Sequence, residues 1–361
     1  MMSNTLLHLR CYIKELGPVR AYKRKKNKQK LLSKNTEEAI NSFVCRELSS
    51  EEKRLLSKDM KEKAKRYGFS YEEYFLLHLQ GKSEEQVSEY ISDFEHVEIV
   101  EKMNKAKNQA IFDDKALTYK YFSKYYHRAC AFAEPSTRGI ECIRAFAEQY
   151  GTFILKPIEK ASGVGVQVVH GEKSDELQEI SKKLLEKYKY GVFVEELIQQ
   201  VPLMKELHPS SVNTVRIPTI RCSDSETVIF HPFLRVGRGD SVVDNAGAGG
   251  IICALDETSG TVIAARDERG NEYTIHPETG IQLLGFKIPQ WEHAVETAKQ
   301  LAQVVPSNRY TGWDLALTDS GWIMVEGNAR GQFVWQYSTL EGCRSEINRL
   351  FNKMRIKYNR I

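Results

Sequence analysis

The sequence predicts an α+β protein in which a helical N-terminal region precedes two lobes built from hairpins and helices. Three observations lead to this fold class. The first hundred residues are rich in charge but poor in glycine and β-branched residues, and they repeat a helix-start signal. After residue 110, helical patterns alternate with short β-like runs. These runs lie close enough in sequence to pair as hairpins, which favours an α+β arrangement over a doubly wound parallel sheet.

The composition excludes several classes of protein. The chain has 361 residues, of which 41% are hydrophobic and 28% charged, as expected for a globular protein with a sizeable core. The 52 Lys and Arg residues against 48 Asp and Glu residues give a net charge of only +4, so we expect no nucleic-acid partner. The seven cysteines include no CxxC pair, which argues against a disulfide framework and a cysteine zinc site. Because no apolar run is long enough for a bilayer, the sequence predicts a soluble, cytoplasmic protein.

Residues 1–105 are predicted to form a helical, basic N-terminal region. Three serines are each followed, three residues later, by an acid or an amide, which is the pattern of a capping box at a helix start. These serines are Ser49, Ser70 and Ser83. Gly68 and Gly81 are expected to end the first two helices, because glycine readily adopts the left-handed conformation found at helix C-termini.

The segment from Arg20 to Lys34 (RAYKRKKNKQKLLSK) is strongly basic. One interpretation is peripheral association with an anionic surface or another anionic partner. The other interpretation is a solvated helix or a flexible arm, which is the usual fate of a charged run. Both interpretations stay open at this point.

Residues 106–195 are predicted to form the first lobe, and residues 196–361 the second. The first lobe is expected to contain helices at Asp114–Tyr126, Ile140–Tyr150 and Leu177–Tyr188, and strands at Phe153–Leu155, Val166–Val169 and Val192–Glu195. The second lobe is expected to contain strands at Thr214–Ile220, Val228–Leu234, Gly250–Leu255, Thr261–Ala265, Trp313–Thr318 and Trp322–Glu326, and a helix at Ala294–Val305 that Pro306 ends.

The most informative segment is TGWDLALTDSGWIMVEGNARG, residues 311–331. Asp319-Ser320-Gly321 has the composition of a three-residue hairpin loop with glycine in the left-handed position. The register that follows from this loop pairs Thr318 with Trp322, Ala316 with Met324, and Asp314 with Glu326.

Two carboxylates and one amide are expected on a single face of this hairpin, because side chains alternate along a strand. They belong to Asp314, Glu326 and Asn328. Opposed carboxylates with Cβ atoms about 5 Å apart repel each other unless a positive charge lies between them. Oxygen ligands of this kind suit Mg²⁺, which often binds between carboxylates and substrate phosphates. We therefore predict a magnesium site, the alternative being an exposed sheet edge with two solvated acids.

A lysine and a glycine-bearing loop follow one another in FILKPIEKASGVGVQVV, residues 153–169. Lys156 ends a hydrophobic strand, and the loop carries Ser162, Gly163 and Gly165. Glycine allows backbone N–H groups to approach an anion closely, and lysine supplies a point charge for phosphate. The segment matches neither GxxxxGK[ST] nor a complete GxGxxG. It is interpreted as a phosphate-binding loop, with an ordinary hairpin turn as the alternative.

Charged residues also end or occupy the neighbouring strands. VFVEELI ends in Glu195 and Glu196, which taken alone describe a strand that meets solvent. Arg216, Arg235 and Arg238 then appear on successive strands. A buried arginine suits bidentate contact with a phosphate or a carboxylate, although an arginine taken singly is as often a surface residue.

The order of these elements resembles the ATP-grasp superfamily: a lysine strand, a glycine-rich loop, an acid-ended strand, an arginine strand and an Asp…Glu-x-Asn hairpin. In detail the sequence is similar to the sugar-transfer-associated ATP-grasp group, which is related to α-L-glutamate-ligase-like proteins. The stretches that carry the resemblance are SVNTVRI (211–217), LRVGRGDSVVDNAGAGG (234–250), IHPETG (275–280), GFKIPQW (285–291) and GWDLALTDSGWIMVEGN (312–328). The resemblance runs from about Asp113 to Trp335.

The resemblance implies a role for each matching residue. Lys156 would bind the phosphates of ATP, and the loop Ser162–Gly165 would close over them. Glu195 and Glu196, with the backbone of Leu197 and Ile198, would line the adenine and ribose pocket. Asp314, Glu326 and Asn328 would hold Mg²⁺, and Arg216 and Arg235 would face the transferred phosphoryl group or the substrate carboxylate. In contrast to many ATP-grasp ligases, Gly312 and Trp313 rather than an arginine precede Asp314.

The resemblance also implies the reaction. Members of the superfamily typically convert a carboxylate into an acylphosphate, which an amine attacks to give an amide, with release of ADP and phosphate. We therefore expect an ATP-dependent carboxylate–amine ligase that acts on small molecules, one of which is sugar-linked if the group's description applies, as in polysaccharide or cell-surface biosynthesis. A phosphotransferase that forms no amide and a non-catalytic nucleotide-binding scaffold are the alternatives.

Overall fold

The structure is a computed structural model that describes residues 22, 26–27, 29–158, 165–171, 174–241, 244 and 249–358. Ser162 and Gly163 of the predicted phosphate loop lie outside these residues, as do parts of the basic run Arg20–Lys34. None of the helices in the described ranges combines the length and the apolar character needed to cross a membrane. Helices combined with antiparallel sheets confirm the predicted α+β fold class.

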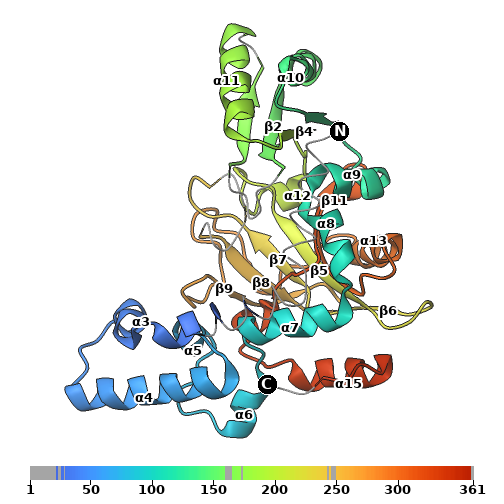
Figure 1. Ribbon diagram of the computed structural model, residues 1–361. Helices are drawn as coiled ribbons and strands as arrows, with labels where there is room; N and C mark the ends of the chain where they lie inside the picture. The colour runs from blue at the N-terminus through green and yellow to red at the C-terminus, as the bar shows by residue number, and fades with distance from the viewer. Residues whose placement is uncertain are drawn as a thin grey trace.

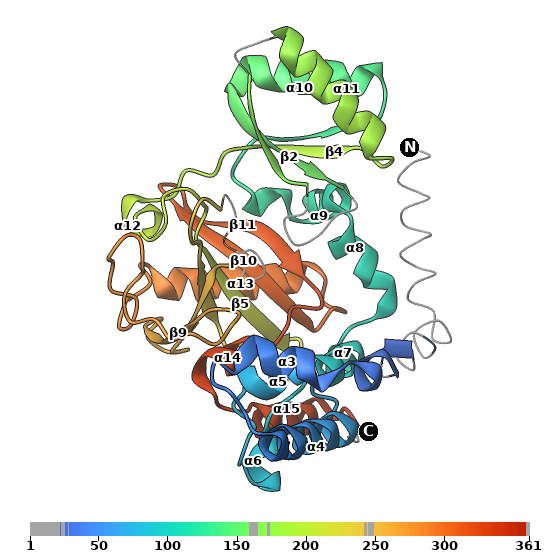
Figure 2. The same cartoon turned by 90° about the vertical axis from the view of Figure 1, so that its left-hand side faces the viewer.

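A four-stranded antiparallel sheet with the strand order β1-β4-β2-β3 forms the upper part of the molecule (Figure 1). Its strands are β1 (Cys130–Ala133), β2 (Thr152–Pro157), β3 (Gln167–His170) and β4 (Val192–Glu196). The helices α10 (Thr137–Tyr150) and α11 (Ser174–Lys187) cover one face, and their apolar side chains share a core with β2 and β4 (Figure 2). Sequence analysis missed β1, since four residues are too few to show an alternating pattern.

A larger antiparallel sheet of seven strands forms the centre of the molecule, with the order β11-β10-β5-β7-β8-β9 and with β6 paired to β5. Its strands are β5 (Thr214–Arg221), β6 (Thr227–Ile229), β7 (Phe233–Val236), β8 (Ile251–Leu255), β9 (Val262–Arg266), β10 (Tyr310–Thr318) and β11 (Gly321–Asn328). The short helix α12 (Pro202–Lys205) lies on the connection between the two sheets.

The prediction of one continuous strand over Val228–Leu234 is wrong. The chain forms β6 and β7 instead, and the two strands pair with different parts of β5. His231 breaks the strand because its backbone is left-handed, with a φ of 50°. Pro232 follows and has no N–H group to donate to a ladder.

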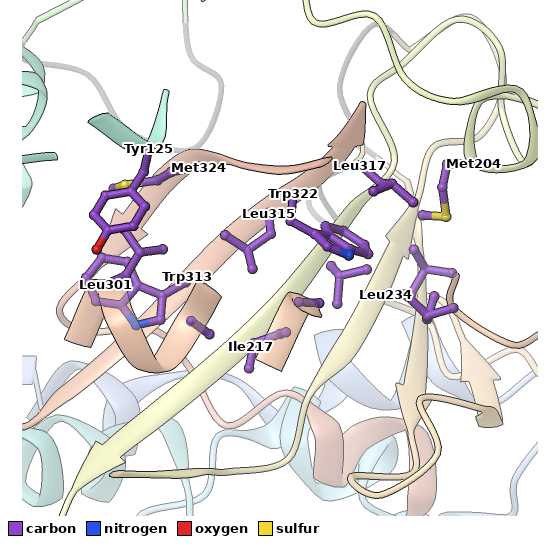
Figure 3. Close-up of a cluster of buried hydrophobic side chains, with 14 of the residues drawn as sticks. Tyr125, Met204, Ile217, Leu234, Leu301, Trp313, Leu315, Leu317, Trp322 and Met324 are labelled. Carbon is purple, nitrogen blue, oxygen red and sulfur yellow. The ribbon is translucent and has the colours of Figure 1, made fainter. Parts of the chain in front are cut away.

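The main hydrophobic core lies between the large sheet and α13 (Trp291–Val304), which Figure 3 shows in close-up. Trp313, Leu315 and Leu317 of β10 alternate along the strand and pack in this core, as does Leu301 of the helix. Because side chains alternate along a strand, the intervening Asp314 points to the opposite face of the sheet. The packing of this core therefore determines which face of the sheet carries the predicted site.

The N-terminal helices form a layer at the bottom of the molecule (Figure 1). They are α3 (Thr36–Phe43), α4 (Ser50–Tyr67), α5 (Tyr71–Leu76), α6 (Glu84–Glu89) and α7 (Asp93–Met103). The capping boxes predicted at Ser49, Ser70 and Ser83 are all present. Gly68 caps α4 in the left-handed conformation as predicted, but Gly81 does not cap α5. That helix ends earlier because His78 already adopts a left-handed backbone, with a φ of 49°.

This helical layer packs against the C-terminal helices α14 (Trp335–Thr339) and α15 (Arg344–Met354). The buried Arg344 donates to both carboxylate oxygens of Glu95 on α7, at 2.7 and 2.5 Å. From α7 the chain runs along the side of the large sheet to the small sheet (Figure 2). The helical elements of this connection are η1 (Ala106–Asn108), α8 (Gln109–Asp113), α9 (Lys115–Phe122) and η2 (Ser123–Tyr125).

Candidate active site

The hairpin of β10 and β11 pairs Asp314 with Glu326, as predicted, but it does so through a different register. The turn contains two residues rather than three, so Thr318 pairs with Gly321, and Ala316 pairs with Ile323 rather than with Met324. A register shift between Asp314 and Leu315 then compensates for the shorter turn. The predicted pairs nearest the turn are therefore wrong, while the pair of carboxylates is confirmed.

The amide of Asn328 connects the two carboxylates. Its Nδ2 atom donates to Glu326 Oε1 at 3.0 Å and lies 3.3 Å from Asp314 Oδ2. The three side chains thus meet on one face of the hairpin, as the alternation of β11 requires.

Two arginines from neighbouring strands neutralise the buried carboxylate of Asp314. Arg216 lies opposite it on β5 and binds both of its oxygens, with Nη2 at 2.7 Å from Oδ2. Arg235 on β7 places its Nη2 2.7 Å from the same Oδ2 atom. Burial alone raises the pKa of Asp314, but the two guanidinium charges outweigh it and lower this pKa to about 2. Repulsion between the two acids therefore does not by itself require a metal, because the arginines already balance the charge of Asp314.

The donor set nevertheless fits a magnesium ion. Two carboxylates and an amide lie within reach of one another on one face, and each of these groups carries an oxygen atom of the kind that Mg²⁺ prefers, although the amide presents its nitrogen to the carboxylates here. No group of three or more His, Cys, Asp or Glu residues that could hold a metal occurs among the described residues. The amide of Asn328 would accordingly have to complete such a site.

Gly312 provides the space in which Arg216 lies across β10. A Cβ atom at this position would come within 2.9 Å of Arg216 Cδ. A side chain there would therefore displace the guanidinium group from Asp314. This close approach explains why glycine occupies position 312, two residues before the buried Asp314.

A second charged cluster lies on the small sheet around the buried Glu195. Lys156 on β2 forms an ion pair with Glu195 Oε1, and Arg128 donates from Nε and Nη2 to Oε2 at 3.0 and 2.7 Å. Burial raises the pKa of Glu195, but the charges of Arg128 and Lys156 dominate and lower it to about 2. The cluster thus keeps the buried carboxylate of Glu195 ionised between two basic side chains.

Arg128 also joins the two clusters. Its Nη1 atom donates to the carbonyl oxygen of Met324 on β11 at 2.8 Å. One guanidinium group thus bridges Glu195 of the small sheet and the hairpin that carries Glu326. Lys115, at the start of α9, lies in the same region, because Glu326, Lys156 and Glu195 all contribute to its electrostatic surroundings. Burial is the largest of these effects and lowers the pKa of Lys115.

The remaining predicted residues lie around these clusters. The carboxylate of Glu196 accepts a hydrogen bond from the backbone N–H of Ala129 at 3.2 Å. Leu197 and Ile198 lie on the connection that leads from β4 to the large sheet. Gly165 has a φ of 80°, and a Cβ atom there would lie 2.6 Å from the hydroxyl oxygen of Tyr188, so this turn requires glycine.

The sequence profile of the family described as sugar-transfer associated ATP-grasp matches residues 95–350. The chain belongs to this family. No curated protein matches the sequence.

Solved structures similar to this ATP-grasp protein share little sequence with it. D-cycloserine synthetase DcsG is 13% identical, with a TM-score of 0.44 over 71% of this chain and 74% of that chain. The ATP-grasp ligase PsnB, complexed with a minimal precursor, is 14% identical, with a TM-score of 0.43 over 70% and 63%. D-alanyl-alanine synthetase A from Vibrio cholerae O1 biovar eltor str. N16961 is 11% identical, with a TM-score of 0.42 over 68% and 66%. The chain thus spans less than two thirds of the last two structures.

Sequence analysis of this ATP-grasp protein missed two charged residues that the structure brings to the clusters. Arg128 precedes β1, a strand that was not predicted, so no pattern marked it. Lys115 directly follows Asp114, whose side chain accepts from Leu117 N at 3.0 Å and caps α9. A lysine in the first turn of a helix is electrostatically unfavourable, and this was the one signal that could have identified it.

Proposed function

We propose that this ATP-grasp protein is an ATP-dependent carboxylate–amine ligase that forms an amide through an acylphosphate. The observation that supports the proposal most directly is the convergence of two charged clusters from different sheets. One cluster contains Lys156 and Glu195, and the other contains Asp314 and Glu326. Such an arrangement offers cations for phosphates and oxygen ligands for a metal next to one another.

In this proposal ATP binds between the two sheets, that is, between a lobe of residues 106–195 and a lobe of residues 196–361. Lys156 and Lys115 bind its phosphates, and the loop Ser162–Gly165 covers them. The adenine and ribose lie against Glu195, Glu196 and the backbone of Leu197 and Ile198. Because an acylphosphate hydrolyses in water, a loop that closes over the phosphates would protect it.

Asp314, Glu326 and Asn328 would hold Mg²⁺, which would neutralise negative charge on the transferred phosphoryl group. Arg216 and Arg235 are proposed to face this phosphoryl group or the substrate carboxylate. Both guanidinium groups are already oriented by Asp314, so they need no reorganisation when the charge develops.

The bonds change in two steps in this proposal. A carboxylate oxygen of the substrate attacks the γ-phosphorus of ATP, and the bond to ADP breaks. The amine nitrogen then attacks the acyl carbon and loses a proton, and inorganic phosphate leaves with the electron pair of the broken C–O bond. Phosphorylation is needed because a free carboxylate has no leaving group at neutral pH.

We further propose that one of the small-molecule substrates is linked to a sugar, as the description of the family suggests. The corresponding role is in polysaccharide or cell-surface biosynthesis, with the reaction on the cytoplasmic side. The basic run Arg20–Lys34 is proposed to bring the protein to an anionic surface.

The proposal is tested by ADP release with pooled carboxylates and amines, followed by mass spectrometry of each positive pool. A ligase yields ADP and a condensed product that is lighter than its two substrates together by one water. Lys156→Met should lower ADP release at least about 100-fold, since its charge contacts the transferred phosphate. Lys61→Met, an exposed residue on α4, is the matched control and should retain activity. ADP release with a phosphorylated acid and no condensed product would instead identify a phosphotransferase.

A further inference from the structure

A basic hollow of about 330 Å³ lies at the opposite end of β5 and β10 from the candidate active site. It is formed by the C-terminal end of α7, the end of β5 and the segment that leads into β10. The polar residues that line it are Lys102, Asn104, Lys105, Arg221, Ser307 and Arg309. Arg221 lies five residues from Arg216 along β5, which corresponds to about 17 Å. The hollow is therefore separate from the proposed ATP site.

The hollow is strongly positive. Its lining includes four cationic side chains and, within the described part of the chain, no carboxylate. Arg221 is partly compensated, because it donates to Asp224 at 2.7 Å and to the carbonyl of Pro306 at 3.2 Å. The side chains of Lys102, Lys105 and Arg309 make no hydrogen bond or ion pair with any described residue. Three cations around one small cavity repel one another unless an anion lies between them.

The walls of the hollow are held by hydrogen bonds. Asn104 accepts from Tyr310 N at 2.8 Å and donates to the carbonyls of Tyr310 and Ala329 at 2.8 and 2.7 Å. The backbone N–H of Arg221 donates to the carbonyl of Arg309 at 2.8 Å. These bonds tie the end of α7 to the start of β10, so the backbone that carries the cations is held in place before any ligand arrives.

The hollow also offers a neutral donor. Ser307 Oγ accepts from Asn108 Nδ2 at 2.7 Å, which leaves its hydroxyl hydrogen for a ligand. Lysines contribute point charges, and an arginine contributes a planar pair of N–H groups that matches two phosphate oxygens.

We propose that this hollow binds a phosphate monoester dianion at a site separate from the candidate active site. The ligand could be a small soluble phosphate ester or the phosphate of a lipid headgroup, since both present the same dianion. The volume accommodates a phosphate group and a short organic part but not a polymer. The inference is independent of the proposed ligase activity, because none of its residues belongs to the proposed ATP site.

The test uses the full chain, saturated with a non-hydrolysable ATP analogue so that the ATP site is occupied. Inorganic phosphate and glycerol 3-phosphate are then titrated by calorimetry. Lys105→Gln combined with Arg309→Gln should weaken binding at least about tenfold. The matched control, Lys58→Gln with Lys61→Gln, removes the same charge from exposed positions on α4 and should change affinity less than about twofold. Lys105→Gln alone should weaken binding severalfold. Because this position is exposed, the single variant is expected to fold, and it tests the proposal even if the double variant does not fold.

A second arm distinguishes the two sources of the dianion. Vesicles of phosphatidylcholine with or without phosphatidic acid are sedimented with the wild type, the double variant and the control. Binding of free phosphate esters that depends on Lys105 and Arg309 supports a soluble ligand. Binding only to phosphatidic acid vesicles, with the same dependence, supports a lipid headgroup. The proposal is overturned if neither probe binds, or if the double variant binds as well as the control.

Discussion

At the scale of single residues, the candidate site depends on buried carboxylates that pair with cationic side chains from other parts of the fold. Asp314 is wholly buried, yet it stays ionised because Arg216 and Arg235 hold its two oxygens. Glu326 is only half-buried and receives a hydrogen bond from Asn328. The two opposed acids therefore differ in what their removal should do to the fold.

We predict that Asp314→Asn and Glu326→Gln each abolish most Mg²⁺-dependent ATP turnover, but only the first should destabilise the protein strongly. Asp314→Asn leaves the buried guanidinium group of Arg216 without its carboxylate, while Arg235 keeps Asp244 at 3.6 Å, and the loss of the buried ion pair costs about 3–5 kcal/mol. Glu326→Gln should change stability by less than about 1 kcal/mol. Chemical denaturation beside an ADP-release assay measures both effects. Equal stability of the two variants would contradict the proposed role of the arginines.

At the scale of secondary-structure elements, a buried acid joins two helices of the N-terminal layer to the C-terminal helix α14. Glu73 on α5 accepts from the backbone N–H of Asp93 on α7 at 2.7 Å and from the hydroxyl of Tyr337 on α14 at 3.0 Å. Burial, and then the nearby charge of Asp93, raise the pKa of Glu73 to about 7. The protonated form is therefore the one that the folded layer favours.

The raised pKa predicts that stability decreases as pH rises through neutrality. The contribution of Glu73 is fully present below its unfolded pKa of about 4.5 and is lost as pH rises through about 7. Thermal melts of the wild type should therefore show a lower Tm at pH 8 than at pH 5. Glu73→Gln should reduce this difference, because it removes the group that ionises. Glu72→Gln, the adjacent control, should leave it unchanged, because the pKa of Glu72 is lowered and it stays ionised over this range.

At the scale of the whole molecule, one guanidinium group connects the two sheets, in addition to the chain itself and to the apolar core that they share. Arg128 binds Glu195 in the small sheet and the carbonyl of Met324 in the large one. It also lies over the ring of Tyr126, at 4.5 Å from the centroid. Arg128 thus helps to set the position of the proposed phosphate lysine relative to the hairpin that is proposed to bind Mg²⁺, together with Phe193 of β4, which packs in the same apolar core as Met324 of β11.

We predict that Arg128→Met lowers stability by about 3–5 kcal/mol, because it leaves the buried Glu195 with Lys156 as its remaining cation. It should also raise the KM for ATP, since Lys156 is then drawn more strongly to Glu195. Arg138→Met, at an exposed position of α10 in the same lobe, is the matched control. A Tm equal to that of the control would show that Arg128 does not connect the sheets.

The sequence by itself determined the features that depend on neighbours along the chain. Serine caps mark the starts of α4, α5 and α6, and the alternation along β11 places Glu326 and Asn328 on one face. Only the tertiary structure decided how the charges pair. Arg216 and Asp314 are 98 residues apart, and Arg128 and Met324 are 196 apart, so neither contact leaves a local pattern. Periodicity and capping arise from a few adjacent residues, whereas a buried ion pair depends on which strands the whole chain brings side by side.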